Sequence, residues 1–243
     1  MKKDIQLIAL DMDGTLLDNN HQVSEQNKQA IQQAKAKGVE VIISTGRHYQ
    51  TSADIAKELG VHYLITVNGS EIWTMTGELI ARQTVDAEII KKLVDIKEEH
   101  QTWAWLSSTE NIWRGEVPED LLVHQWLKFG FDTDNPETKE KIVKTISSWN
   151  DIEVSNSSPT NIEVNAVGVN KAAAIEVVCE RIGINMSQVM SMGDSLNDIK
   201  MIKEAGTGVA MGNAQDEVKQ AADWITTTNN QDGVAKAIEK WVL

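Results

Sequence analysis

Ile8-Ala9-Leu10-Asp11-Met12-Asp13-Gly14-Thr15 is the stretch of sequence that decides the fold. The apolar run that ends at Leu10 predicts a buried strand. Two carboxylates at spacing i, i+2 follow at the C-terminal end of this strand, where open α/β sheets place their ligands. Gly14 allows a sharp turn that leaves Asp11 presented rather than buried in the sheet. Asp and Gly are also ordinary turn formers, so the pair needs support from elsewhere in the chain.

Apolar segments and helical patterns alternate after this stretch. Strands are predicted over 39–43 and 63–67, with helices over 24–37 and 49–59. The pattern returns near the C-terminus, with strands expected over 189–192, 208–211 and 224–226 and a helix after each. Strands that alternate with single helices predict a parallel, right-handedly wound sheet, and hence an α/β fold.

The middle of the chain has a different pattern. A helix over 86–99 is followed by short segments over 102–107 and 161–167, which predicts an antiparallel α+β unit inserted into the core. The expected domains are a core of residues 1–83 and 166–243 and an insert of residues 84–165. Five of the eight tryptophans lie in this insert. We expect most of them to fill its core rather than form an aromatic substrate platform: Trp103, Trp105, Trp113, Trp126 and Trp149.

The composition narrows the class of partner. Acidic residues outnumber basic ones by 36 to 23, and the net charge of -13 would repel nucleic acid and anionic lipid. No stretch approaches the ~20 apolar residues of a membrane span, and the N-terminal apolar run is too short for a signal peptide. The single cysteine, Cys179, cannot form an internal disulfide. These features predict a cytoplasmic protein with no nucleic-acid, membrane or obligate protein partner.

A second cluster of carboxylates follows a second predicted strand. The strand over 189–192 continues into Gly-Asp-Ser-Leu-Asn-Asp at 193–198. If the two strands are parallel neighbours, Asp11, Asp13 and Asp194 meet at one edge of the sheet. Oxygen ligands without Cys or His suit Mg²⁺. Asp198 fits equally well as a direct ligand or as a simple acid at a helix start, where negative charge is favourable.

Groups that suit an anion occur at three further points. Lys171 stands at the start of a predicted helix, where a positive charge opposes the helix dipole unless it serves an anion. Thr45-Gly46-Arg47 ends the second strand with a hydroxyl, a backbone amide and a guanidinium that suit phosphate. Asn68 follows the third strand in the same way.

Four motifs occur in order: Asp-Met-Asp-Gly-Thr at 11–15, Ser-Thr-Gly-Arg at 44–47, Lys171, and Gly-Asp-Ser-Leu-Asn-Asp at 193–198. On these motifs the chain resembles the haloacid dehalogenase superfamily, and within it the Cof-type phosphatases of subfamily IIB. The combination is specific although each motif separately is not. The resemblance implies a Rossmann-like parallel-sheet core with an inserted C2-type α+β cap that sets substrate specificity.

The resemblance also implies a role for each motif residue. Asp11 would be the nucleophile and a metal ligand, and Asp13 the general acid and base that also offers its backbone carbonyl to Mg²⁺. Asp194 and Asp198 would complete the metal site. The phosphate would be held by the backbone amide of Met12, Thr45, Gly46, Lys171 and Asn197, with Arg47 and Asn68 as possible substrate contacts.

The function expected is that of a Mg²⁺-dependent phosphatase, a phosphoric monoester hydrolase that forms an aspartyl phosphate on Asp11. Its partner would be a small phosphate ester, with a sugar phosphate or a phosphorylated riboflavin precursor preferred. A phosphomutase or phosphotransferase could use the same intermediate and pass it to a hydroxyl instead of water. A non-catalytic regulatory protein that keeps the fold is the alternative from another class.

Overall fold

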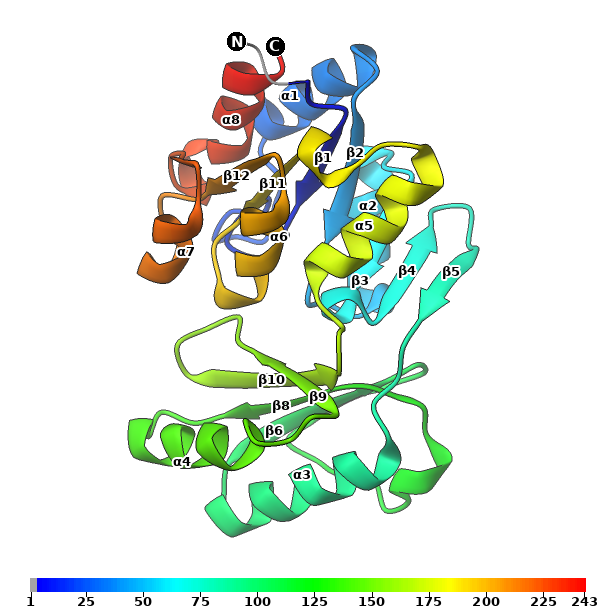
Figure 1. The fold of residues 1–243 in the computed structure, drawn as a ribbon, viewed down its shortest axis with the longest axis vertical. Helices are drawn as coiled ribbons and strands as arrows, with labels where there is room; N and C mark the ends of the chain where they lie inside the picture. The colour runs from blue at the N-terminus through cyan, green and yellow to red at the C-terminus, as the bar shows by residue number, and fades with distance from the viewer. Residues whose placement is uncertain (1–3) are drawn as a thin grey trace. The chain divides into compact units, whose positions relative to one another are not determined.

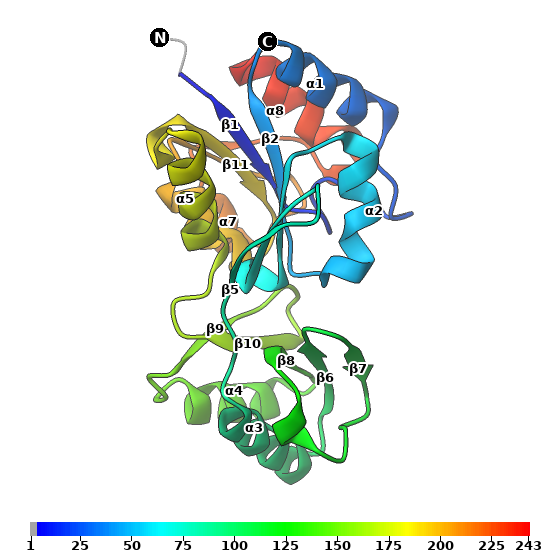
Figure 2. The same cartoon turned by 90° about the vertical axis from the view of Figure 1, so that its right-hand side faces the viewer.

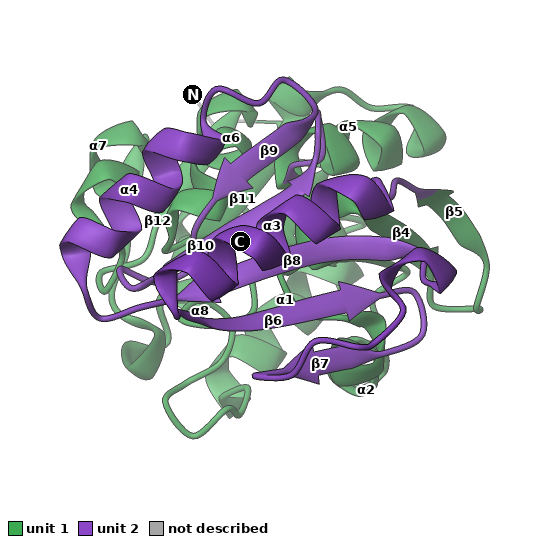
Figure 3. Cartoon of the chain, turned by 90° about the horizontal axis from the view of Figure 1, so that it is seen from below, with its two compact units in different colours: residues 1–81, 171–243 green, residues 82–170 purple. Residues whose placement is uncertain are grey.

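The computed structural model describes residues 4–243 and divides into two compact units (Figure 1, Figure 3). The first unit contains the chain up to residue 81 and residues 171–243, and the second contains residues 82–170. The second unit begins two residues before the predicted insert and ends five residues after it. The extra residues belong to it because Val169 packs in its core and the backbone N–H of Val167 donates to Asp151.

The first unit is built on an eight-stranded sheet in the order β13-β12-β11-β1-β2-β3-β4-β5. Its parallel strands are β1 (Leu7–Leu10), β2 (Glu40–Ser44), β3 (Tyr63–Thr66), β11 (Val189–Gly193), β12 (Thr207–Ala210) and β13 (Trp224–Ile225). The predicted strands are therefore present, and β1 pairs with β11 in register from Leu7 opposite Val189 to Leu10 opposite Met192. This pairing brings the two acidic motifs to one sheet edge.

The helices of the first unit cover both faces of the sheet. They are α1 (Glu25–Ala36), α2 (Tyr49–Leu59), α5 (Lys171–Ile182), α6 (Ile199–Glu204), α7 (Asp216–Ala221) and α8 (Gly233–Trp241). Figure 2 shows α1, α2 and α8 on one face and α5 on the other. The hydroxyl of Ser24 caps α1, and Gly60 ends α2 in the left-handed conformation, so the predicted helix boundaries are confirmed.

Two strands at one edge of this sheet differ from the expected all-parallel arrangement. β4 (Glu71–Thr74) pairs antiparallel with β3, and β5 (Leu79–Arg82) lies beyond it. Only the short 3₁₀ turn η1 (Val67–Gly69) and Ser70 connect β3 to β4. A parallel strand needs a crossover of a dozen residues or more, so this short connection permits only an antiparallel return. The second unit therefore begins at the end of β5, with Arg82, and not directly after β3.

The second unit is an antiparallel five-stranded sheet in the order β7-β6-β8-β10-β9, with two helices on one face (Figure 3). Its elements are α3 (Ala87–His100), β6 (Trp103–Ser108), β7 (Ile112–Arg114), β8 (Trp126–Asp132), α4 (Pro136–Ile146), β9 (Ile152–Ser155) and β10 (Asn161–Ala166). It also contains the short 3₁₀ turn η2 (Leu121–Val123), and the first unit contains η3 (Met186–Gln188), η4 (Leu196–Asp198) and η5 (Asn229–Gln231). Between residues 4 and 243, no helix has the length and apolar character needed to cross a bilayer.

Three of the five tryptophans of the second unit contribute to its core. Trp126 is fully buried there, and Trp113 and Trp149 pack against the same cluster. The expectation that most of these side chains fill the core is therefore confirmed. Trp103 and Trp105 alternate along β6 with the core residue Ala104, which places them on the other face of the strand. Their ring centroids are 5.8 Å apart.

Candidate active site

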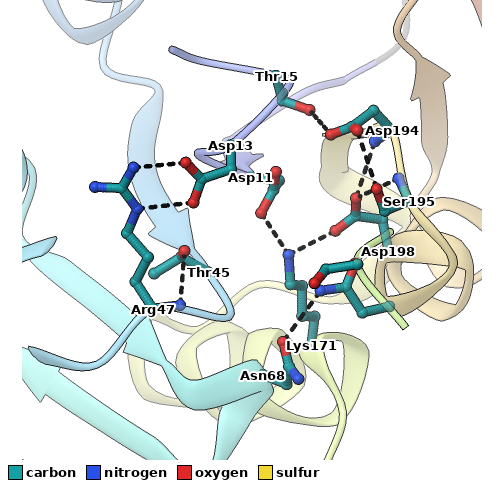
Figure 4. Close-up of polar contacts among 12 residues, drawn as sticks. Asp11, Asp13, Thr15, Thr45, Arg47, Asn68, Lys171, Asp194, Ser195 and Asp198 are labelled. Atoms are coloured by element: carbon teal, nitrogen blue, oxygen red, sulfur yellow. Dashed lines mark hydrogen bonds and ion pairs between the residues drawn. The ribbon is translucent and has the colours of Figure 1, made fainter. Parts of the chain in front are cut away.

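The polar motifs meet at the carboxyl edge of the core sheet. Asp11 follows β1, Thr45 follows β2 and Asp194 follows β11, so three neighbouring strands end in functional groups. The backbone N–H of Asp11 donates to the carbonyl of Met192 at 3.0 Å, which extends the pairing of β1 with β11 up to the motif. Figure 4 shows the resulting cluster of side chains.

Lys171 joins two of these carboxylates through its ammonium group. Its Nζ lies 2.5 Å from Oδ1 of Asp11 and 2.6 Å from Oδ1 of Asp198 (Figure 4). The side chains of Lys171 and Asp198 are fully buried, and that of Asp11 is 8% exposed. The three charges come from segments up to 187 residues apart in sequence, so only the tertiary fold assembles them. One cation between two anions leaves this triad with a net negative charge.

Asp198 is held on both sides. While Oδ1 contacts Lys171, Oδ2 accepts the backbone N–H groups of Asp194 at 2.9 Å and Ser195 at 3.1 Å. A Cβ on Gly193 would lie 2.4 Å from the carboxyl carbon of Asp198, so only glycine permits this close approach. Asp198 is thus more than a simple acid at a helix start, because it fixes the loop that carries Asp194.

Asp194 is oriented by two hydroxyl groups. Oδ1 accepts a hydrogen bond from Thr15 at 2.9 Å, and Oδ2 accepts one from Ser195 at 3.0 Å. Gly14 has a φ of +78°, and a Cβ there would lie 2.5 Å from Oδ2 of Asp194. The glycine therefore serves both the turn after Asp13 and the approach of the second acidic motif to the first.

The ionisation of the cluster reflects its crowding. Burial raises the pKa of Asp11 well above its ordinary value, and the charges of Asp198 and Asp194 raise it further against the opposing effect of Lys171. Burial together with the charge of Asp198 raises the pKa of Asp194 to about 6. Burial alone would lower the pKa of Lys171, but the two adjacent carboxylates outweigh it and raise that pKa. The site therefore holds more negative charge than Lys171 balances.

The same crowding fits a divalent cation. Carboxylate oxygens of Asp11, Asp194 and Asp198 all lie within 4.8 Å of one another. The donors are all oxygen, which suits hard ions such as Mg²⁺ or Ca²⁺ rather than zinc or copper. A cation here would stabilise the ionised forms of Asp11 and Asp194, whose pKa values are raised in its absence. The cluster is compatible with a metal site.

The structure does not bring the carboxylate of Asp13 into this cluster. That side chain is half exposed and turns to Arg47, whose Nε donates to Oδ2 at 2.7 Å and whose Nη2 donates to Oδ1 at 2.5 Å (Figure 4). The pairing raises the pKa of Arg47. Nδ1 of His21 lies 3.9 Å from Oδ1 of Asp13. The two motif acids therefore diverge, with Asp11 directed inward and Asp13 toward the mouth of the site.

The remaining predicted residues lie between β2, β3 and η4. Thr45 is buried, and its hydroxyl accepts the backbone N–H of Arg47 at 3.1 Å. Asn68 receives a hydrogen bond from Nδ2 of Asn197 at 3.2 Å and has a φ of +63°. The preceding Val67 also has a positive φ, of +50°, which is a strained conformation for a β-branched residue. Backbone strain of this kind is concentrated at functional sites, which supports a functional role for the turn that holds Asn68.

Three residues with clear roles in the geometry escaped the sequence reasoning. Thr15 and Ser195 orient Asp194, and Nδ2 of Asn213 donates to the carbonyl of Gly14 at 2.8 Å. Thr15 and Ser195 stand inside the quoted motifs, so their position was an available signal. Asn213 follows β12 in a loop without any comparable pattern, and only the fold brings it to the first motif.

The chain matches the model of the haloacid dehalogenase-like hydrolase family over residues 8–122 and 116–238. These segments contain every motif residue of the candidate site. The chain therefore belongs to the haloacid dehalogenase-like hydrolases.

Individual relatives show which members of the family this chain resembles. The chain is 52% identical over 241 residues to the 5-amino-6-(5-phospho-D-ribitylamino)uracil phosphatase YcsE of Bacillus subtilis (strain 168), with 99% of this chain and 97% of that protein covered. A solved haloacid dehalogenase-like hydrolase from B. subtilis has a TM-score of 0.90 at 27% identity, covering 98% of this chain and all of that one. A subclass IIB sugar phosphatase of the superfamily has a TM-score of 0.84 at 25% identity, with 97% and 98% covered. The Cof-type α/β fold is confirmed.

Proposed function

We propose that this chain hydrolyses the phosphate ester of 5-amino-6-(5-phospho-D-ribitylamino)uracil, a phosphorylated riboflavin precursor. Its enzyme class is that of the phosphatases, to which its relatives in the family belong. The choice of substrate is supported by the 52% identity, over nearly the whole chain, to the B. subtilis phosphatase that carries this name. Of the two substrate classes preferred from the sequence, this identity favours the riboflavin precursor over a sugar phosphate.

The reaction begins at Asp11. Its carboxylate attacks phosphorus in line with the ester oxygen, and an aspartyl phosphate forms as the ester bond breaks. An anionic nucleophile and an anionic phosphate repel each other, and Lys171 at 2.5 Å from Asp11 offsets part of that repulsion. The backbone amide of Met12, the hydroxyl of Thr45 and the amide of Gly46 are assigned to the phosphate oxygens.

A magnesium ion is assigned to Asp11, Asp194 and the backbone carbonyl of Asp13. Asp198 is assigned to the support of these ligands, because both of its oxygens already accept hydrogen bonds from Lys171 and from the backbone of the Asp194 loop. When bound, the ion neutralises charge on the phosphate as a Lewis acid.

Asp13 is the proposed general acid and base. Its half-exposed carboxyl group, which points away from the buried cluster around Asp11, supports this role because a departing alkoxide needs a proton donor that solvent can reach. It donates a proton to the departing alkoxide and then removes one from the water that hydrolyses the aspartyl phosphate, so one group serves both half-reactions. Asn197, Asn68 and Arg47 border the site and are assigned to the substrate.

The contact of Lys171 with both Asp11 and Asp198 carries this proposal, because it places the carboxyl group of the proposed nucleophile beside a fixed cation in a buried site. The test is phosphate release by the purified protein with Mg²⁺ from 5-amino-6-(5-phospho-D-ribitylamino)uracil, ribose 5-phosphate and glucose 6-phosphate. We expect the highest kcat/KM for the first ester and none above background for Asp11→Asn. A higher kcat/KM for either sugar phosphate would reject the substrate.

Two alternatives give different results in the same assay. A phosphotransferase or phosphomutase would release little inorganic phosphate, and an added alcohol acceptor would speed consumption of the ester while the phosphoryl group passes to that alcohol. A non-catalytic regulatory protein would give only background with every ester. Exchange of residues 84–165 for the cap of a related phosphatase tests the proposed role of this segment, which should change the ranking of esters while acetyl phosphate is still hydrolysed.

A further inference from the structure

A cavity of about 410 Å³ opens beside Asp13 on the first unit. This volume lies within the range of ~300–1,000 Å³ that is usual for small-molecule sites. The turn after β1, the loop after β12 and the segment around η5 contribute its walls. The lining residues are Asp13, Gly14, Asp18, Asn19, His21, Asn213, Thr228, Asn229 and Asn230. Of these residues, Asp13 has a proposed catalytic role, and Gly14 and Asn213 support the first acidic motif.

One wall is a tight turn. Oδ1 of Asp18 accepts the backbone N–H groups of Asn20 at 2.8 Å and Gln22 at 2.9 Å, and the N–H of His21 donates to the carbonyl of Asp18 at 2.9 Å. His21 has a φ of +59°, an uncommon conformation for a residue other than glycine. This turn holds His21 within 3.9 Å of Asp13. These hydrogen bonds therefore fix the conformation of this wall.

The other wall is joined to the first by amide groups. The backbone N–H of Asn19 donates to Oδ1 of Asn230 at 3.0 Å, and Nδ2 of Asn229 donates to the carbonyl of Leu17 at 2.9 Å. Oδ1 of Asn213 accepts the backbone N–H of Asn229 at 2.9 Å. Within residues 4–243, the side-chain NH₂ groups of Asn19 and Asn230 donate no hydrogen bond. Two donor groups, each with two N–H bonds, thus remain available at the cavity.

The side chains that line the cavity favour one class of ligand over others. The lining contains no lysine or arginine and two carboxylates, Asp13 and Asp18, so it disfavours a second anionic group. Apart from the His21 imidazole, it has no large apolar or aromatic side chain on which a flat heterocycle could stack. Amide, hydroxyl and imidazole groups suit a neutral chain of hydroxyl groups, which both donates and accepts hydrogen bonds.

We propose that this cavity binds the polyol part of the leaving group, the ribityl chain that joins the phosphate to the heterocycle. The inference rests on the proposed function for the identity of the chain. Asp13 borders both the reacting ester oxygen and the cavity, so a polyol attached to that oxygen can enter directly. The amides of Asn19 and Asn230 then bind hydroxyl groups of the chain and set its direction away from the phosphate.

The test compares two esters on two variants. D-ribitol 5-phosphate carries the polyol without the heterocycle, and acetyl phosphate carries neither. The ratio of kcat/KM for ribitol 5-phosphate to that for acetyl phosphate should fall about tenfold in the double variant Asn19→Leu/Asn230→Leu, since it loses hydrogen bonds to substrate hydroxyls. Asn20→Leu is the matched control, because Asn20 lies in the same turn but does not line the cavity. Its ratio should equal that of the wild type.

Three outcomes distinguish this inference from the proposed function. An unchanged ratio in the double variant, or an equal fall in the Asn20→Leu control, overturns the cavity assignment. If the wild type hydrolyses the aminouracil ester while the ratio is unchanged, the proposed function stands and the cavity assignment fails. If the wild type does not hydrolyse that ester but the ratio falls only in the double variant, the cavity binds polyols and the proposed substrate is wrong.

Discussion

The guanidinium of Arg47 donates two hydrogen bonds to the carboxylate of Asp13, of 2.7 Å from Nε and 2.5 Å from Nη2. This fork matches a planar carboxylate in a way that a lysine ammonium cannot. A substrate phosphate is also a strong acceptor for arginine. Arg47 therefore positions Asp13, the proposed acid, before substrate binds. The Asp13 carboxylate and the substrate phosphate then compete for the N–H donors of the Arg47 guanidinium.

Replacing Arg47 by Lys keeps the positive charge but removes the fork. We expect kcat on an alkyl phosphate to fall by about tenfold, because a misplaced acid protonates the leaving oxygen poorly. With p-nitrophenyl phosphate, whose leaving group needs little protonation, the fall should be much smaller. Steady-state kinetics with both esters measures the difference, and equal losses on the two would remove Arg47 from the positioning of Asp13.

Replacing Asp11 by Asn should remove activity without loss of stability. The amide cannot act as a nucleophile, so kcat should fall by at least about 10³-fold. The raised pKa of Asp11 means that folding disfavours its ionised form, so at neutral pH the neutral amide removes an unfavourable charge. The Tm of EDTA-treated Asp11→Asn should therefore be no lower than that of the EDTA-treated wild type, as thermal unfolding can measure. A markedly lower Tm would show that the attraction between Asp11 and Lys171 stabilises the fold more than burial and carboxylate repulsion at Asp11 destabilise it.

Metal affinity should depend on pH through Asp194. Its pKa is raised to about 6 in the metal-free site, so protons compete with Mg²⁺ below that pH and not above it. The apparent Kd for Mg²⁺ from calorimetric titration should rise as the pH falls through about 6, by up to about tenfold per pH unit from proton competition at Asp194 alone.

Two variants control this measurement. Asp194→Asn should bind Mg²⁺ more weakly with a flatter pH dependence, since the titrating ligand is gone. Asp216→Asn, on α7 with a 90% exposed side chain, should match the wild type. The same steep dependence in Asp194→Asn would assign the competing proton to another group.

The second unit contains a buried ion pair whose disruption should be costly. Nζ of Lys128 lies 3.1 Å from Oε1 of Glu163, and the two side chains are 5% and 4% exposed. Lys128→Met leaves a buried carboxylate supported by Ser157 at 3.0 Å, and should lower the free energy of unfolding of this unit by about 3 kcal/mol. The double variant Lys128→Met/Glu163→Leu should recover most of that loss. Five of the eight tryptophans lie in this unit, so urea unfolding followed by tryptophan fluorescence reports mainly on it. A single variant as stable as the double would contradict the expectation.

Local sequence determined the elements of the core and the candidates for its site. Apolar runs that end in small or polar residues, such as the one before Asp11, predicted the parallel strands, because such burial and periodicity are encoded over a few residues. Gly60 and Ser24 marked helix ends through backbone and capping preferences that are equally local. Motif spacing placed Asp11 and Asp194 at strand ends, and the parallel pairing of β1 with β11 brought them to one edge.

Only the tertiary structure decided which of these groups touch. Lys171 and Asp11 are 160 residues apart in sequence, and Asp13 and Arg47 are 34 apart. Local conformational propensity therefore predicts neither contact. The turn of β4 against β3 followed from a connection too short for a crossover, which the strand pattern did not reveal. The polar cavity likewise combines a turn after β1 with loops after β12 and β13. Sequence encodes local conformation and burial, whereas the direction of each side chain depends on neighbours that only the folded chain supplies.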